Sequence, residues 1–179
     1  YANISKVIHN ESYRVDLLET LGLQNITLSE NEIAEMFIAD LLTEIPATKL
    51  LSAVNNSSDK AIISEKAVNE PIAEINAAIS AAKSVNSKDA NANLTAGTVL
   101  MNSTKTALKQ VRDIVGVTST KYQMVADNLA KQILQCGINY YNNASDDDVE
   151  SPRKAMPLQA YALQIAIGQL TKDRCQENY

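Results

Sequence analysis

The sequence predicts an all-α fold, either an antiparallel helical bundle or a short stack of helical hairpins. Aromatic residues make up 4 % of the 179 positions, and 5 glycines and 4 prolines occur, so strand formers and turn residues are both scarce. Apolar residues recur at intervals of three or four, the period of one helix face. With 45 % hydrophobic residues the chain can bury a sizeable core. We therefore expect one all-α domain over 1–179, with a hinge near 55–59 between an N-terminal helix pair and a C-terminal bundle.

The first predicted helix lies within the first 22 residues of the chain. Apolar residues from Ile4 to Leu21 follow a helical spacing, and Gly22 comes next as a C-cap. His9 and Asn10 interrupt the apolar pattern, so we expect a break there.

The second predicted helix begins at a capping box formed by Ser29 and Glu32. Pro46 ends this helix because proline disfavours helical geometry at the residue before it. A short helix over 47–54 follows.

The middle of the chain combines a polar loop with two longer helices. The stretch from Asn55 to Asp59 is the most loop-like of the sequence. Pro71 is predicted to open the next helix, which continues to a polar turn at 86–89. A three-four alternation of apolar and small residues over 90–115 predicts a long helix in a bundle seam.

The stretch 119–175 predicts a helical hairpin. Its first helix covers 121–142 and its second 157–174, with a polar acidic turn over 143–150. Either Ser151–Pro152 or Met156–Pro157 restarts the chain after the turn. One buried stripe on the first helix is expected to contain Tyr122, Val125, Leu129, Ile133, Cys136 and Tyr140.

Composition argues against nucleic acid and membrane as partners. The 16 basic and 21 acidic residues give a net charge of −5, and basic residues do not cluster, so a phosphate backbone would find little to bind. No apolar run reaches the roughly 20 residues that a membrane-spanning helix needs. We expect a chain that is soluble and not membrane-embedded.

Motifs that carry chemistry are missing from the sequence. His9 is the only histidine, which excludes His-based metal cages and Ser-His-Asp triads within one chain. Neither phosphate-binding glycine pattern occurs. The acidic turn 146–150 lacks the glycine and ligand spacing of a calcium loop. We therefore predict no catalytic residue, no cofactor, no metal site and no enzyme activity.

Two features bear on cellular location and favour different compartments. Cys136 and Cys175 lie at distant points of the predicted hairpin, so we expect two free thiols, which favours a reducing cytoplasmic environment. Asn-x-Ser/Thr sequons favour the secretory pathway or, alternatively, reflect an Asn-rich composition. The eight sequons begin at Asn3, Asn10, Asn25, Asn55, Asn56, Asn93, Asn102 and Asn143.

Part of the hairpin matches a family pattern. Gly137 is followed three positions later by Tyr140, and Ala155 and Ala162 lie seven positions apart in the next helix. Over 134–165 this pattern resembles a tetratricopeptide-type helical hairpin. The resemblance covers less than a quarter of the chain. It implies a scaffold that binds a peptide or partner protein on a concave helical face, without catalysis.

Three apolar residues lie off the buried stripe of 121–142 and are predicted to bind a partner. Met124, Ile138 and Tyr141 are too apolar for a solvated face, and exposed tyrosines are frequent anchors in interfaces. We expect a non-catalytic protein–protein interaction or scaffold module, whose partner is a protein or a second copy. The alternative is a secreted or surface-exposed helical-bundle protein, N-glycosylated, oligomeric or carrying an apolar ligand.

Overall fold

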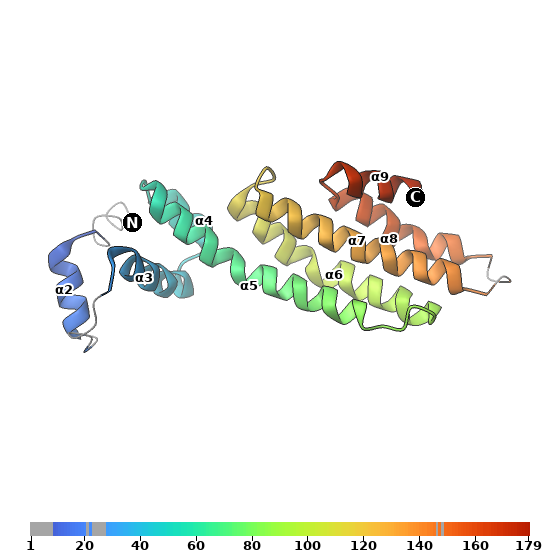
Figure 1. The fold of residues 1–179 in the computed structure, drawn as a ribbon, viewed down its shortest axis with the longest axis horizontal. Coiled ribbons are helices and arrows are strands. Elements are labelled where there is room, and N and C mark those ends of the chain that lie inside the picture. Colours follow the sequence, from blue (N-terminus) through green and yellow to red (C-terminus); the bar gives the residue numbers. More distant parts are fainter. Residues whose placement is uncertain (1–8, 21, 23–27, 146, 148) are drawn as a thin grey trace. The chain divides into compact units, whose positions relative to one another are not determined.

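A computed structural model describes residues 9–20, 22, 28–145, 147 and 149–179 (Figure 1). These residues form α-helices joined by turns, and none of them lies in a β-strand. The predicted all-α fold is therefore confirmed. Within the same residues, no helix is both long enough and apolar enough to cross a bilayer.

The chain divides into two compact units at Asn69–Glu70. This division lies within one helix, immediately before Pro71, and not in the 55–59 segment. The expected single domain with a hinge at 55–59 stays a prediction. Helix α5 contributes to both units, each unit has its own buried side chains, and the two are described separately.

The first unit contains α2 (Glu11–Thr20), α3 (Glu30–Glu44), α4 (Ala47–Ala53) and the first half of α5 (Ser57–Lys83). The core of this unit consists of Ala34, Ile38, Leu50, Val54 and Ile63.

Local signals set the ends of these helices as predicted. The Ser29 hydroxyl accepts from the Glu32 N–H, and the Glu32 carboxylate accepts from the Ser29 N–H at 2.8 Å, which confirms the capping box. His9 and Asn10 are not helical, and α2 begins at Glu11, while the residues on the other side of the expected break lie outside the described ones. Gly22 has a φ of 66°, the left-handed geometry that favours glycine after a helix. The expected helical start at Ile4 lies outside the described residues.

Helix α5 corrects two predictions. It begins at Ser57, so most of the predicted 55–59 loop is helical, and it continues through Pro71 to Lys83. The Asn56 side chain accepts from the Ser58 N–H at 2.8 Å, which starts the helix earlier than expected. Pro71 forfeits one backbone hydrogen bond, but Val68 and Ile75 on either side are fully buried. Burial on both sides of the proline favours one continuous helix.

The second unit is built around α6 (Ala90–Val115), α7 (Thr120–Asn143) and α8 (Ser151–Ile165), followed by α9 (Gln169–Glu177). Asp89 caps α6 by accepting from the Ala92 N–H, and Gly116 ends it with a φ of 81°. Helix α7 runs back along α6, and α8 runs back along α7 (Figure 1). The predicted buried stripe of α7 is confirmed, because all six of its residues are buried.

The predicted second helix of the hairpin, 157–174, was wrong at both ends. The chain restarts at Ser151 with Pro152 in the first turn, so the first of the two expected starts is confirmed. Pro157 then lies inside α8, which ends at Ile165, and α9 is a separate helix.

The break between α8 and α9 is held by Asp127, a residue of α7. One oxygen of its carboxylate accepts from the N–H groups of Ile167 at 2.8 Å and Gly168 at 3.0 Å. A Cβ atom on Gly168 would lie 2.5 Å from the other oxygen of Asp127, so a larger residue there would require the Asp127 carboxylate to shift. The apolar spacing of 157–174 continues across the break, which is why the sequence pattern did not reveal it.

Candidate functional site

A surface groove lies where the end of α7, the start of α8 and the end of α9 meet. Its volume is about 400 Å³. We define this C-terminal groove by the residues that line it: Ile138, Tyr141, Asn142, Pro152, Ala155, Met156, Gln159, Glu177, Asn178 and Tyr179.

The rim of the C-terminal groove exposes large apolar side chains. Tyr141, Met156 and Tyr179 are exposed by 52 %, 47 % and 62 %, and Ile138 is half-buried between them. Contiguous exposed apolar side chains are uncommon on a protein surface with no further role. Tyrosine also supplies both apolar area and a hydroxyl at low entropic cost, so it is frequent in interfaces.

The structure brings together two of the three predicted partner-binding residues. Ile138 and Tyr141 lie in the C-terminal groove. Met124 does not line it, because it lies near the other end of α7, about 25 Å from Tyr141 along the helix axis. Met124 is 62 % exposed, and its role in partner binding stays a prediction.

Sequence reasoning missed the groove residues contributed by α8 and α9. Met156 lies off the buried positions Ala155, Leu158 and Ala162 of α8, so the off-stripe criterion applied to α7 would have found it. Tyr179 follows the last turn of α9, and no periodicity indicates its side chain. Its place beside α7 depends on the break between α8 and α9.

Close packing beneath the groove fixes the position of α8. Gly97 of α6 lies so near to its neighbours that an added Cβ would be 2.6 Å from Leu158 Cδ1 and 2.8 Å from Cys136 Cβ. A Cβ on Gly137 of α7 would meet Leu158 Cβ at 3.6 Å, an ordinary contact. The side chain of Leu158, 1 % exposed, therefore fills the space that the two glycines leave.

A chain of side-chain hydrogen bonds links α6, α7 and α9. Arg174 donates to Gln135 at 2.9 Å, and the Gln135 amide donates to Asn139 at 2.9 Å. Asn139 in turn donates to Asn93 at 3.0 Å. Asn93, 1 % exposed, donates to two backbone carbonyls of the 86–89 turn at 2.8 and 2.7 Å. This network holds α9 in register with α7 and so positions its end at the C-terminal groove.

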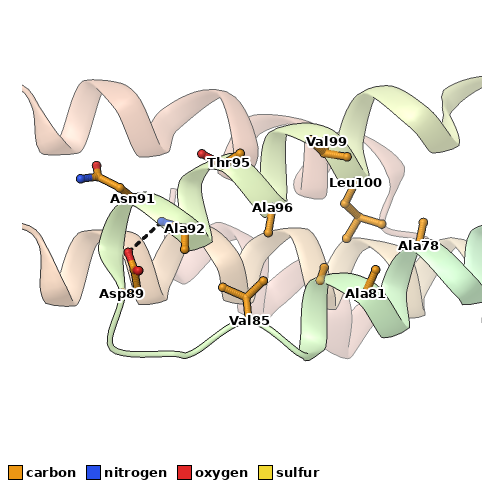
Figure 2. A pocket seen from close by; sticks show the side chains of 11 residues that line it. Ala78, Ala81, Val85, Asp89, Asn91, Ala92, Thr95, Ala96, Val99 and Leu100 are labelled. Atoms are coloured by element: carbon orange, nitrogen blue, oxygen red, sulfur yellow. Dashed lines mark hydrogen bonds between the residues drawn. The ribbon is translucent and has the colours of Figure 1, made fainter.

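A second groove lies between the end of α5 and the start of α6 (Figure 2). Its volume is about 540 Å³, and its walls are mostly alanine and valine side chains. Val99 stands at its edge, 60 % exposed. We define this α5–α6 groove by its lining residues: Ala78, Ala81, Ala82, Val85, Asp89, Asn91, Ala92, Thr95, Ala96, Val99 and Leu100.

Potential metal ligands and thiols are located in the described part of the chain. No cluster of three His, Cys, Asp or Glu residues able to hold a metal occurs there, and Asp146 and Asp148 of the acidic turn lie outside it. Cys136 and Cys175 are free, as expected, and both are buried. Burial raises the pKa of both thiols, which disfavours the nucleophilic thiolate.

The single histidine contacts a buried acid in the first unit. His9 Nε2 lies 3.1 Å from one carboxylate oxygen of Asp59, which is fully buried in the first turn of α5. The side chain of His9 is 33 % exposed. Its contact ties the residues before α2 to the start of α5.

Comparison of the chain with protein-family models, with curated protein sequences and with solved structures gives no match. The fold and its surfaces therefore define the class: an all-α protein of packed helix pairs, whose second unit carries two grooves with apolar side chains.

Proposed function

We propose that this chain is a non-catalytic helical module that binds an extended segment of another protein in its C-terminal groove. The observation that carries the proposal is the exposed rim of Tyr141, Met156 and Tyr179 around the half-buried Ile138. Binding would remove these side chains from water, at about 25 cal/mol for each Å² of apolar surface.

The polar residues of the groove fit a peptide backbone. The side chains of Asn142 and Gln159 make no hydrogen bond within the described residues, and each amide can both donate and accept. The donor and the acceptor of each side-chain amide match the alternating N–H and C=O groups of an extended peptide. Glu177 adds a carboxylate at the same groove, which favours a basic side chain in the partner.

The tetratricopeptide-like pattern supports the same function. Gly137, Tyr140, Ala155 and Ala162 are all buried where α7 packs against α8. In the family that the pattern resembles, such a hairpin presents a peptide-binding face.

Peptide display can test the proposal. A random peptide library would be panned against the full chain, and the enriched peptides measured against variants. Tyr141→Ala with Met156→Ser changes two exposed side chains, so the melting temperature should stay within a few degrees. Peptide binding should weaken about tenfold or more, because tyrosine anchors dominate interface energies.

Leu170→Ser is the matched control, since Leu170 is 86 % exposed and lies outside the groove. Enriched peptides should bind this variant as they bind the native chain. If the peptides bind the double variant as tightly as the native chain, or lose affinity equally for both variants, the C-terminal groove is not the peptide-binding site. Sedimentation of the chain alone tests self-association. If the chain forms a dimer and the double variant does not, the partner in the C-terminal groove is a second copy of this chain and not a peptide.

A second candidate function is the transport or storage of an apolar ligand by a secreted or surface protein. The observation in its favour is the apolar lining of the α5–α6 groove. An environment-sensitive naphthalene sulfonate dye should bind there and lose fluorescence when Ala96→Leu fills the groove. Unchanged dye fluorescence in that variant would remove this candidate.

The sequons bear on the same candidate. Asn10, Asn55 and Asn102 are exposed and leave room for a glycan. The Asn93 amide is buried and donates two hydrogen bonds, so a glycan on its nitrogen is incompatible with this packing. A glycosylated chain should therefore carry sugar at exposed sequons and not at Asn93, which peptide mass mapping would show.

A further inference from the structure

A third cavity, distinct from both grooves, lies between α6, the start of α7 and α8. Its volume is about 200 Å³. We call it the α6–α8 pocket. Leu108 and Ile165 form its apolar wall. Its polar lining consists of Lys105, Lys109, Arg112, Tyr122, Tyr161 and Gln164.

Two phenol hydroxyls line the α6–α8 pocket, those of Tyr122 and Tyr161. Tyr122 is 6 % exposed, and Tyr161 is half-buried. Neither hydroxyl forms a hydrogen bond with any residue that the structure describes. Both hydroxyl oxygens are in contact with solvent, so these two groups are available to a ligand in the pocket.

The protonation of Tyr161 suits hydrogen-bond donation. Burial, and secondly the neighbouring Tyr122, raise the pKa of the Tyr161 hydroxyl above its ordinary value. The hydroxyl therefore stays protonated at neutral pH and donates to an acceptor. Both phenol groups line the same pocket.

The charges around the pocket are predominantly positive. Lys109 and Arg112 share one carboxylate, that of Asp113. Lys105 lies over the Tyr161 ring, 5.3 Å from its centre, and donates to the neutral Asn102 side chain. No carboxylate is among the lining residues.

Near the pocket, the carboxylate of Asp113 compensates one of three positive charges, so two remain uncompensated. The three cations are Lys105, Lys109 and Arg112. Tyr122 also belongs to the first turn of α7, where the helix dipole adds positive potential.

We propose that the α6–α8 pocket binds a phosphoryl group, carried by a small organic phosphate. A phosphate monoester brings close to two negative charges at neutral pH, which matches the excess positive charge better than a single carboxylate does. Its oxygens accept from the guanidinium of Arg112 and from the two phenol hydroxyls. Leu108 and Ile165 then contact the organic part of the ester.

Calorimetry on the full chain tests this site with two probes, phenyl phosphate and inorganic phosphate. Tyr122→Phe removes one hydroxyl and keeps the packed ring, so the melting temperature should not fall. The same change should weaken phosphate binding about tenfold, the effect of losing one hydrogen bond to a charged group. Arg112→Gln should weaken it at least as much.

Lys131→Gln is the matched control, because Lys131 is an exposed cation outside the pocket. The Lys131→Gln variant should bind phenyl phosphate with the same affinity as the native chain. With tyrosine rings labelled for NMR, the signals of Tyr122 and Tyr161 should shift on titration while that of the exposed Tyr141 stays fixed.

The two probes separate the sources of the phosphoryl group. Tighter binding of phenyl phosphate supports an organic ester, and equal binding of both probes overturns the ester in favour of free phosphate. Absence of saturable binding, or equal loss in Lys131→Gln and Arg112→Gln, overturns the site. Because neither probe involves the C-terminal groove, failure here leaves the proposed peptide binding untouched.

Discussion

Helix α6 uses small residues on two sides, with opposite results. Toward α7 and α8, Gly97 is in such close contact that no Cβ would fit beside Leu158 and Cys136. Toward α5, Ala92 and Ala96 line a groove of about 540 Å³ (Figure 2). The same kind of residue thus accompanies a dense seam on one side and a groove on the other.

The difference lies in what the facing helix supplies. Opposite Gly97, the large side chain of Leu158 reaches into the space, so the seam is filled. On the groove side, α5 contributes Ala78 and Ala81, which are also small. Small residues produce close packing only when the opposite surface provides a side chain to fill the remaining volume.

Removal of the filling side chain should have the largest effect on stability. Leu158→Ala is expected to lower the free energy of unfolding by about 2–5 kcal/mol, since the buried side chain is lost and a cavity remains. Urea unfolding followed by circular dichroism measures the change. Leu170→Ala, on an exposed side chain, should cost less than about 0.5 kcal/mol. Similar losses in both variants would mean that the seam is not dense.

The contact between α7 and the α8–α9 break is polar, and it should be next in magnitude. Asp127→Ala leaves the N–H groups of Ile167 and Gly168 without their acceptor, at a cost of about 1–3 kcal/mol. Urea unfolding measures this cost, and hydrogen exchange at these two amides should also become faster. Asp173→Ala, whose carboxylate accepts from the exposed Gln169 side chain, is the control and should be nearly neutral. Unchanged exchange would show that the break forms without Asp127.

Gly97→Ala tests the dense side of α6 directly. Overpacking typically costs about 1–3 kcal/mol, and the better helix propensity of alanine offsets about 1 kcal/mol. We expect a net loss of up to about 2 kcal/mol in urea unfolding. In a Leu158→Ala background the loss should shrink, because one of the two clashing groups is absent. Equal losses in both backgrounds would assign the cost to Cys136 alone.

Ala96→Leu tests the groove side of the same helix and should have the smallest effect. The new side chain enters the α5–α6 groove, so the free energy of unfolding should change by less than about 0.5 kcal/mol. The same urea titration measures it beside Gly97→Ala, one residue away. A loss comparable to that of Gly97→Ala would show that the two sides of α6 are equally dense.

Part of the candidate site could be predicted from the sequence, because amphipathic spacing along one helix is a local property. Ile138 and Tyr141 were identified as apolar residues outside a buried stripe, and they line one groove. Met156 lies on α8 and Tyr179 follows α9, so no spacing within α7 points to them. The α6–α8 pocket is likewise assembled from residues on three helices, which no short motif connects.

The sequence by itself determined where most helices begin and end. The capping box at Ser29, the Asp89 cap and the turn at Gly116 act within about four residues, so their geometry follows from local chemistry. Tertiary structure decided whether a helix continues. Helix α5 continues through Pro71 because the residues on both sides of the proline are buried. Helix α8 ends where the Asp127 carboxylate accepts from the N–H of Ile167, 40 residues away in the sequence. Both outcomes depend on burial and on hydrogen bonds to groups distant in the chain, which local periodicity does not contain.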